Sequence, residues 1–233
     1  MAQCQPAAPG DHHPARVGRW GGAGVVGTGS SVKAFDTTSA PSASWFQQAY
    51  KDGFRLYVLS GNSWGQNTRW PQASGLCELA LDAGLKIAVY TRDPRWYAAG
   101  ISACKPYVNR LQFFALDIES DPGVAVTRAM VNAVAAMGVR PVIYSGYGMW
   151  PQIMGATNTS FADVPLWDTN AGSATSMNPV SYTPNFLTPK PVAYGGWNTS
   201  NNLRIGVQQT FETIYNGINI DINSFAADFL TVP

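Results

Sequence analysis

Short apolar runs alternate with amphipathic stretches over most of the chain, and this pattern predicts strands and helices in turn. Strands are expected at residues 32–36, 54–60, 85–90, 111–119 and 139–145. Apolar residues at helical spacing lie between them, at residues 42–53, 70–84, 95–110 and 124–138. A helix between successive strands is typical of a parallel sheet. The run LQFFALDIE is too apolar for a half-exposed strand, so we expect it to be buried in such a sheet.

The helix expected at residues 124–138 has signals at both ends. Asp121 is expected to cap its amino end, Pro122 suits a first helical position, and Gly138 is a stop signal. This helix would follow directly from the most apolar strand of the chain.

The last third of the chain has a different pattern. After a short helical segment at residues 147–153, the segments 162–169, 190–196, 203–210 and 217–223 are expected to be strands, with no clear helices between them. We therefore predict an α/β fold, a TIM-like barrel with about five βα units followed by strands that lack full helical crossovers. A doubly wound open sheet is the alternative. The first strand-to-helix turn, FDTTSAPS, lacks the glycine-rich phosphate-binding pattern that such sheets often carry there.

The amino-terminal part differs in composition from the rest. Residues 1–30 are rich in glycine and proline, so we expect a flexible or irregular leader, followed by one barrel domain at residues 31–233. The leader has no apolar run as long as a secretory signal requires, and we expect no conventional signal peptide. No apolar run reaches the roughly 18 to 20 residues that span a bilayer, so we expect no membrane insertion.

Composition narrows the choice of ligand. Lys and Arg total 15 against 14 Asp and Glu, and this balance gives no field that would attract nucleic acid. Charged residues make up only 12% of the chain, which indicates a polar surface suited to neutral, hydroxyl-rich ligands. The three cysteines, Cys4, Cys77 and Cys104, show no metal-ligand spacing. We expect free thiols, although one pair could form, and we predict neither a metal site nor a cofactor.

Acidic residues stand at the ends of several expected strands, where barrel enzymes carry their reactive groups. They are Asp36, Asp117, Glu119, Asp168 and Asp221. Asp117 and Glu119 are two positions apart and should point to the same side of their strand, into the barrel. Two carboxyl groups in one partly dry cavity resist ionising together, so one should keep its proton near neutral pH. Such a pair is the equipment for cleaving a glycosidic bond.

Strand closure would bring two more acids to the pair. Asp36 lies on the first strand and Asp221 on the last, and these strands become neighbours when a barrel closes. Taken singly, each of these residues is at least as well explained as a turn or cap residue. The hypothesis of one four-acid site therefore depends on the barrel.

With these motifs, the chain resembles glycoside hydrolase family 25, the Chalaropsis-type lysozymes, over about residues 32–230. The matching segments, in order, are AFDTTS with Asp36, LDIES with Asp117 and Glu119, VIYSG with Tyr144, VPLWDT with Trp167, GVQQT with Gln208, and NIDINSF with Asp221. The resemblance implies a barrel whose last three strands lack helices. It also implies an N-acetylmuramidase that cleaves the β-1,4 bond between N-acetylmuramic acid and N-acetylglucosamine in peptidoglycan.

Roles for individual residues follow from the resemblance. Glu119 would be the general acid, while Asp36, Asp117 and Asp221 would position the sugar and stabilise charge. Either a carboxylate or the substrate's own acetamido group would be the nucleophile. Sugar rings stack on aromatic side chains, and Tyr90, Tyr144 and Trp167 are the expected substrate-binding aromatics, together with Gln208. Other aromatics expected near the mouth are Trp64, Trp70, Trp96, Tyr147, Trp150 and Trp197.

Some positions depart from the family pattern. Ala34 and Phe35 replace the glycine expected before the first acid, Val207 replaces a tryptophan, and Tyr90 is followed by Arg92 and Asp93. The opening FDTTSAPS also resembles glycoside-hydrolase-like domains of actinobacterial and phage proteins. Two hypotheses follow: a muramidase, or a non-catalytic wall-binding or virion module. Without a signal peptide, the muramidase would be a phage lysin that acts from the host cytoplasm or is carried on the virion among its proteins, unless another export route is used.

Overall fold

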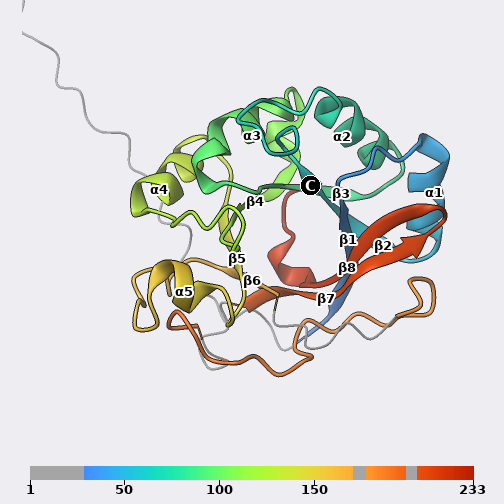
Figure 1. Cartoon of the computed structure of the whole chain (residues 1–233). Helices are drawn as coiled ribbons and strands as arrows, with labels where there is room; N and C mark the ends of the chain where they lie inside the picture. Colours follow the sequence, from blue (N-terminus) through green and yellow to red (C-terminus); the bar gives the residue numbers. More distant parts are fainter. Residues whose placement is uncertain (1–28, 170–176, 198–203) are drawn as a thin grey trace, which may run out of the picture.

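The computed structural model describes residues 29–169, 177–197 and 204–233, and it forms one closed barrel of eight strands (Figure 1). The predicted leader lies almost entirely outside the described residues. The strands are β1 Ser31–Thr37, β2 Phe54–Ser60, β3 Lys86–Thr91, β4 Leu111–Asp117, β5 Pro141–Ser145, β6 Leu166–Asp168, β7 Arg204–Tyr215 and β8 Ile218–Ala226.

The strands follow one another around the barrel in chain order. Every neighbouring pair from β1 to β7 is parallel. The last strand, β8, runs antiparallel to both β7 and β1 and so closes the barrel. The predicted TIM-like barrel is confirmed, and the open-sheet alternative is wrong because β1 pairs with β8.

Helices connect the strands of the first part of the barrel only. They are α1 Ala43–Lys51, α2 Ala73–Asp82, α3 Tyr97–Ala103, α4 Arg128–Ala136 and α5 Trp150–Met154, with short 3-10 turns η1 Pro94–Trp96, η2 Tyr107–Arg110 and η3 Ala227–Phe229. The side chains of Ser42 and Thr127 cap α1 and α4 by accepting backbone N–H bonds. The chain runs from β6 to β7 without a helix in the described residues, as the strand-rich last third predicted.

Two local predictions are wrong, and a third is only partly confirmed. Asp121 does not cap α4, because the chain after β4 first makes a loop and the cap residue is Thr127, six positions later. Residues 190–196 contain no strand beyond a single bridge between Tyr194 and Trp197. The stretch 95–110 is not one helix but α3 between two 3-10 turns.

Alternation along the strands divides the core into two parts. One cluster contains Ala34, Leu56, Ala88 and Phe113 and fills the inside of the barrel. The other contains Phe35, Tyr57, Ile87 and Phe114, each next to a member of the first cluster on the same strand, and packs against α1 to α4. Side chains in step with the first cluster therefore point into the barrel, and toward the carboxyl ends of the strands they reach its mouth.

Two further expectations concern membranes and cysteines. Within the described residues, the helices are all too short or too polar to cross a bilayer. Cys77 and Cys104 are buried free thiols, and Cys4 lies outside the described residues.

Candidate active site

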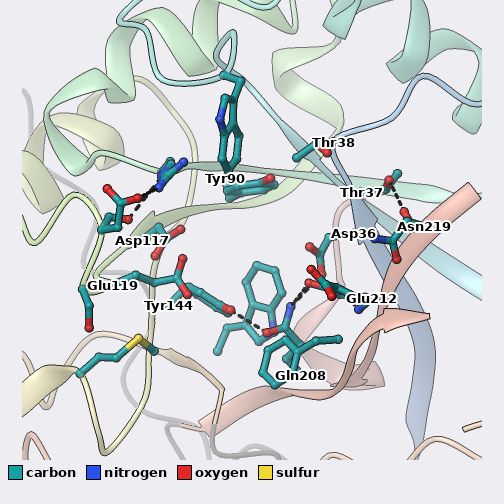
Figure 2. Close-up of a pocket in the computed structure, with 18 of the residues that line it drawn as sticks. Asp36, Thr37, Thr38, Tyr90, Asp117, Glu119, Tyr144, Gln208, Glu212 and Asn219 are labelled. Carbon is teal, nitrogen blue, oxygen red and sulfur yellow. Dashed lines mark hydrogen bonds and ion pairs between the residues drawn. The ribbon is translucent and has the colours of Figure 1, made fainter. Parts of the chain in front are cut away.

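A pocket of about 470 Å³ opens at the carboxyl ends of the parallel strands. The predicted site residues Asp36, Tyr90, Asp117, Glu119, Tyr144, Trp167, Gln208 and Asp221 all line it. Figure 2 shows the labelled members of this set, which come from strands on all sides of the barrel and face one space. Chain closure thus brings together residues that are up to 185 positions apart, Asp36 and Asp221.

Asp117 and Glu119 form the first part of the site. Asp117 is the last residue of β4 and is 3% exposed, and Glu119, two positions later, is half-buried. Phe113 and Ala115 belong to the interior cluster, so the alternation of β4 directs Asp117 into the barrel. Asp117 Oδ1 is buried and accepts no hydrogen bond from the described residues, which leaves this oxygen available to a donor on a ligand.

Asp36 and Asp221 form the second part, and Gln208 links them. The side-chain amide of Gln208 donates to Asp221 Oδ2 at 2.9 Å and to Asp36 Oδ2 at 3.3 Å. Its carbonyl oxygen accepts a 2.6 Å bond from the Tyr144 hydroxyl. The backbone N–H of Glu212 donates to Asp221 Oδ1 at 2.7 Å. A single amide therefore fixes two acids and an aromatic wall of the pocket.

Asn223 extends this network beneath the acids. Its amide donates to Asp36 Oδ2 at 2.7 Å, and its carbonyl oxygen accepts from Trp167 Nε1 at 3.0 Å. The Trp167 ring packs against Tyr144 with centroids 4.5 Å apart. Trp167 is only 2% exposed, so it forms the floor of the pocket and positions Asn223.

Burial raises the pKa of all four acids. Desolvation is the main cause that raises the pKa of Asp36, Asp117, Glu119 and Asp221. The pKa of Asp221 rises to about 6. The neighbouring charge of Glu119 raises the pKa of Asp117 further, and hydrogen bonding between the two raises the pKa of Asp117 while it lowers that of Glu119. The pair therefore titrates as a unit that holds on to a proton.

Arg92 lies beside this pair at the rim of the pocket. Its guanidinium forms an ion pair with Asp121 and stacks on the Trp64 ring, with 4.1 Å between the guanidinium carbon and the ring centroid. The charge of Arg92 lowers the pKa of both Asp117 and Glu119 and so opposes the effect of burial. Among the described residues, no cluster of histidine, cysteine and acidic side chains could hold a metal ion.

Known proteins similar to this chain include lysozymes and muramidases. A curated relative, "Probable GH family 25 lysozyme 3" of Dictyostelium discoideum, is 23% identical, and the match covers 86% of this chain and 42% of the relative. This chain therefore spans less than half of that relative's length. A muramidase structure from Trichobolus zukalii matches with a TM-score of 0.54 and 21% identity over 83% of this chain and 93% of that one. The chain resembles glycoside hydrolase family 25 in both sequence and fold.

The fold is not confined to proteins of stated activity. An uncharacterised B. stearothermophilus protein matches with a TM-score of 0.60 and 12% identity over 85% of this chain and 98% of that one. No family model matches the sequence. Any activity of the family 25 type therefore depends on the side chains of the site.

Some residues in the pocket lining, or hydrogen-bonded to it, were not predicted as site residues. Asn223 lies two positions after Asp221 and so shares its side of β8, a signal that the sequence does contain. Trp64 was only one of six aromatics expected near the mouth, and the other five do not line the pocket. Trp150 and Trp197 of that group are buried core residues. Arg92 appeared only as a departure from the family 25 pattern.

Asp168 differs from the other strand-end acids. It lies outside the pocket and is fully buried, where it accepts a 3.0 Å bond from the Tyr194 hydroxyl. The Arg204 guanidinium lies 3.0 Å from its other oxygen. These contacts indicate that Asp168 stabilises the fold, whereas the other four acids meet at the mouth of the barrel.

Proposed function

We propose that this chain is a peptidoglycan hydrolase, a muramidase-type lysozyme that cleaves the β-1,4 bond between N-acetylmuramic acid and N-acetylglucosamine. The observation that carries the proposal is the convergence of Glu119 with Asp117, Asp36 and Asp221 in one pocket at the carboxyl ends of the strands. The names of the similar proteins, lysozyme and muramidase, support the same reaction.

The proposed reaction begins with a proton transfer. Protonated Glu119 donates its proton to the glycosidic oxygen as the bond from that oxygen to C1 breaks. Burial raises the pKa of Glu119 and so favours the protonated form that this step requires. Water then adds to C1 and returns a proton to the Glu119 carboxylate, which restores the starting state.

The other acids support the charge that develops on the sugar. Asp117 presents a buried oxygen without a hydrogen-bond partner in the described chain, and it would accept a bond from the substrate or stabilise the oxocarbenium centre. Asp36 and Asp221, held by Gln208, form the opposite wall. Both a carboxylate and the substrate's acetamido group are compatible with this arrangement as nucleophile.

Loss of turbidity in a suspension of bacterial cell walls tests the proposal. Wild-type protein should clear the suspension and release reducing sugar, whereas Glu119→Gln should be slower by about 100-fold or more because the general acid is lost. Mass spectrometry of purified peptidoglycan digests should show muramic acid at the new reducing ends. Equal activity of the two proteins across several wall types overturns the assignment. Wall binding without sugar release would instead indicate a non-catalytic binding module.

We further propose that the biological role is that of a phage lysin, made in the host cytoplasm or carried on the virion. The resemblance of FDTTSAPS to domains of phage proteins supports this role. Co-expression with a holin in a susceptible host is the test. Lysis that needs both the holin and Glu119 supports a lysin, and equal lysis by Glu119→Gln contradicts it.

A further inference from the structure

Arg92 is the only cation among the described residues that line the pocket. Six acids share that lining: Asp36, Asp117, Glu119, Asp121, Glu212 and Asp221. A substrate that carries a negative group would be repelled by such a surface, and a neutral substrate would not. The position of the single cation therefore decides where an anionic substituent can lie.

The Arg92 guanidinium is held in place by its neighbours, and some of its N–H donors are not used by them. It bonds the backbone oxygen of Asp121 through Nε and the Asp121 carboxylate through Nη2, and it lies against the face of Trp64. Within the described residues, its Nη1 group donates to no protein acceptor. The Arg92 side chain is 20% exposed and lines the pocket.

Asp121 orients the Arg92 guanidinium but leaves it able to bind another carboxylate. The Asp121 side chain is 83% exposed, and an ion pair this open to water contributes little to stability. A guanidinium matches the planar shape of a carboxylate and binds it through two parallel bonds. An incoming carboxylate can therefore share or displace Asp121 at little cost.

We propose that Arg92, positioned by Trp64 and Asp121, is a specificity-determining residue that binds a carboxylate on the glycan, so that the pocket prefers acidic muramyl chains to neutral chitin-like chains. This inference rests on the proposed function, since it names the substrate class of the same site. The carboxylate is either that of the lactyl group or that of the stem peptide, and both present the same chemistry to Arg92.

Binding in the Glu119→Gln background, measured by calorimetry, tests the inference without hydrolysis. The probes are a peptide-free tetrasaccharide of alternating N-acetylglucosamine and N-acetylmuramic acid, the same compound with its lactyl groups amidated, a peptide-bearing form, and neutral chitotetraose. Adding Arg92→Gln should weaken binding of the acidic glycans by about tenfold and that of chitotetraose by less than about twofold. A loss confined to the peptide-bearing glycan identifies the stem peptide as the source.

Arg128→Gln is the matched control. Arg128 also pairs with an aspartate, Asp163, and lies over an aromatic ring, Phe161, but it is outside the pocket. This variant should bind all probes as its parent does. Arg92→Lys keeps the charge and should recover part of the preference, which separates the role of charge from that of shape.

Equal losses for acidic and neutral glycans, or no loss at all, overturn the inference. So does the failure of the Glu119→Gln protein to bind any of the four probes. Hydrolysis of cell walls by wild-type protein is measured separately, so the proposed function can stand when the inference fails. Conversely, a charge preference that depends on Arg92 in a protein that cleaves nothing would support the inference and contradict the enzyme.

Discussion

Asp36 on β1 and Asp221 on β8 are direct cross-strand partners at the seam where the barrel closes. Like charges opposite each other in a sheet repel, and here burial adds to the cost of ionising them. The charge of Asp221 raises the pKa of Asp36, and the amide of Gln208 bonds both side chains. The closure of the fold thus places two acids in an arrangement that favours a bound proton.

The stability of the protein should depend on pH because of this arrangement. The pKa of Asp221 is about 6 in the folded protein and is near 3.8 without burial, so the folded state binds more protons between these values. Stability from this group is present below about pH 4 and is lost as the pH rises through about 6. As the pH rises from 4 to 7, the free energy of unfolding of Asp221→Asn should therefore increase relative to that of wild type by up to about 3 kcal/mol.

Urea unfolding of both proteins across this pH range measures the difference in the free energy of unfolding. A difference that stays constant with pH would show that folding does not raise the pKa of Asp221.

Arg92 should set the alkaline limit of activity. Its charge lowers the pKa of Glu119, so its removal should raise that pKa and keep the general acid protonated to higher pH. The alkaline limb of the rate profile should then move upward in Arg92→Gln and stay near its original place in Arg92→Lys. Initial rates of wall hydrolysis between pH 4 and pH 9 provide the measurement. A downward shift of the limb in Arg92→Gln contradicts this account.

Gln208 and Gln209 provide a matched pair of variants on β7. Gln208 joins Asp36, Asp221 and Tyr144, whereas Gln209 donates to the backbone oxygens of Asn185 and Thr188 outside the pocket. Replacing either by alanine leaves buried polar groups without partners and should cost about 1 to 3 kcal/mol of stability. Only Gln208→Ala should also reduce turnover per folded molecule, by about tenfold or more.

Chemical denaturation and hydrolysis rates, each normalised to the folded fraction, distinguish the two glutamines. Equal loss of turnover in both variants would mean that β7 acts through general stability and that Gln208 has no special place in the site.

Asp168 should affect folding and leave the chemistry intact. Arg204 is buried against it, and removing one partner of a buried ion pair costs about 3 to 5 kcal/mol. Arg204→Gln should lower the stability by this amount, while molecules that remain folded hydrolyse walls at the wild-type rate. Melting temperature and rate together check the prediction. A fall in rate without a fall in melting temperature would return Asp168 to the list of functional acids.

The sequence was sufficient for the barrel and for the acids because both depend on simple periodicity. The two-residue spacing of Asp117 and Glu119 fixes their shared direction once β4 is a buried strand. The first and last strands pair because the barrel closes, and this pairing brings Asp36 and Asp221 together as expected.

The rest depends on contacts between residues distant in sequence. Trp150 and Trp64 look alike in the sequence, but one is fully buried in the core and the other is 67% exposed at the mouth. Asp121 has the signature of a helix cap, yet the loop after β4 carries it to Arg92 on the neighbouring strand's loop. Local propensity could not have shown either outcome, because tertiary contacts decide both.

The reversed direction of β8 determines where the chain leaves the barrel. Lys86 and Gln112, near the starts of β3 and β4, donate side-chain bonds to the backbone oxygens of Leu230 and Val232. Residues 230–232 are thus anchored at the base, at the opposite end from the pocket. A tag, surface linker or second module joined after Pro233 would begin on the side away from the pocket and would leave the mouth of the barrel unobstructed.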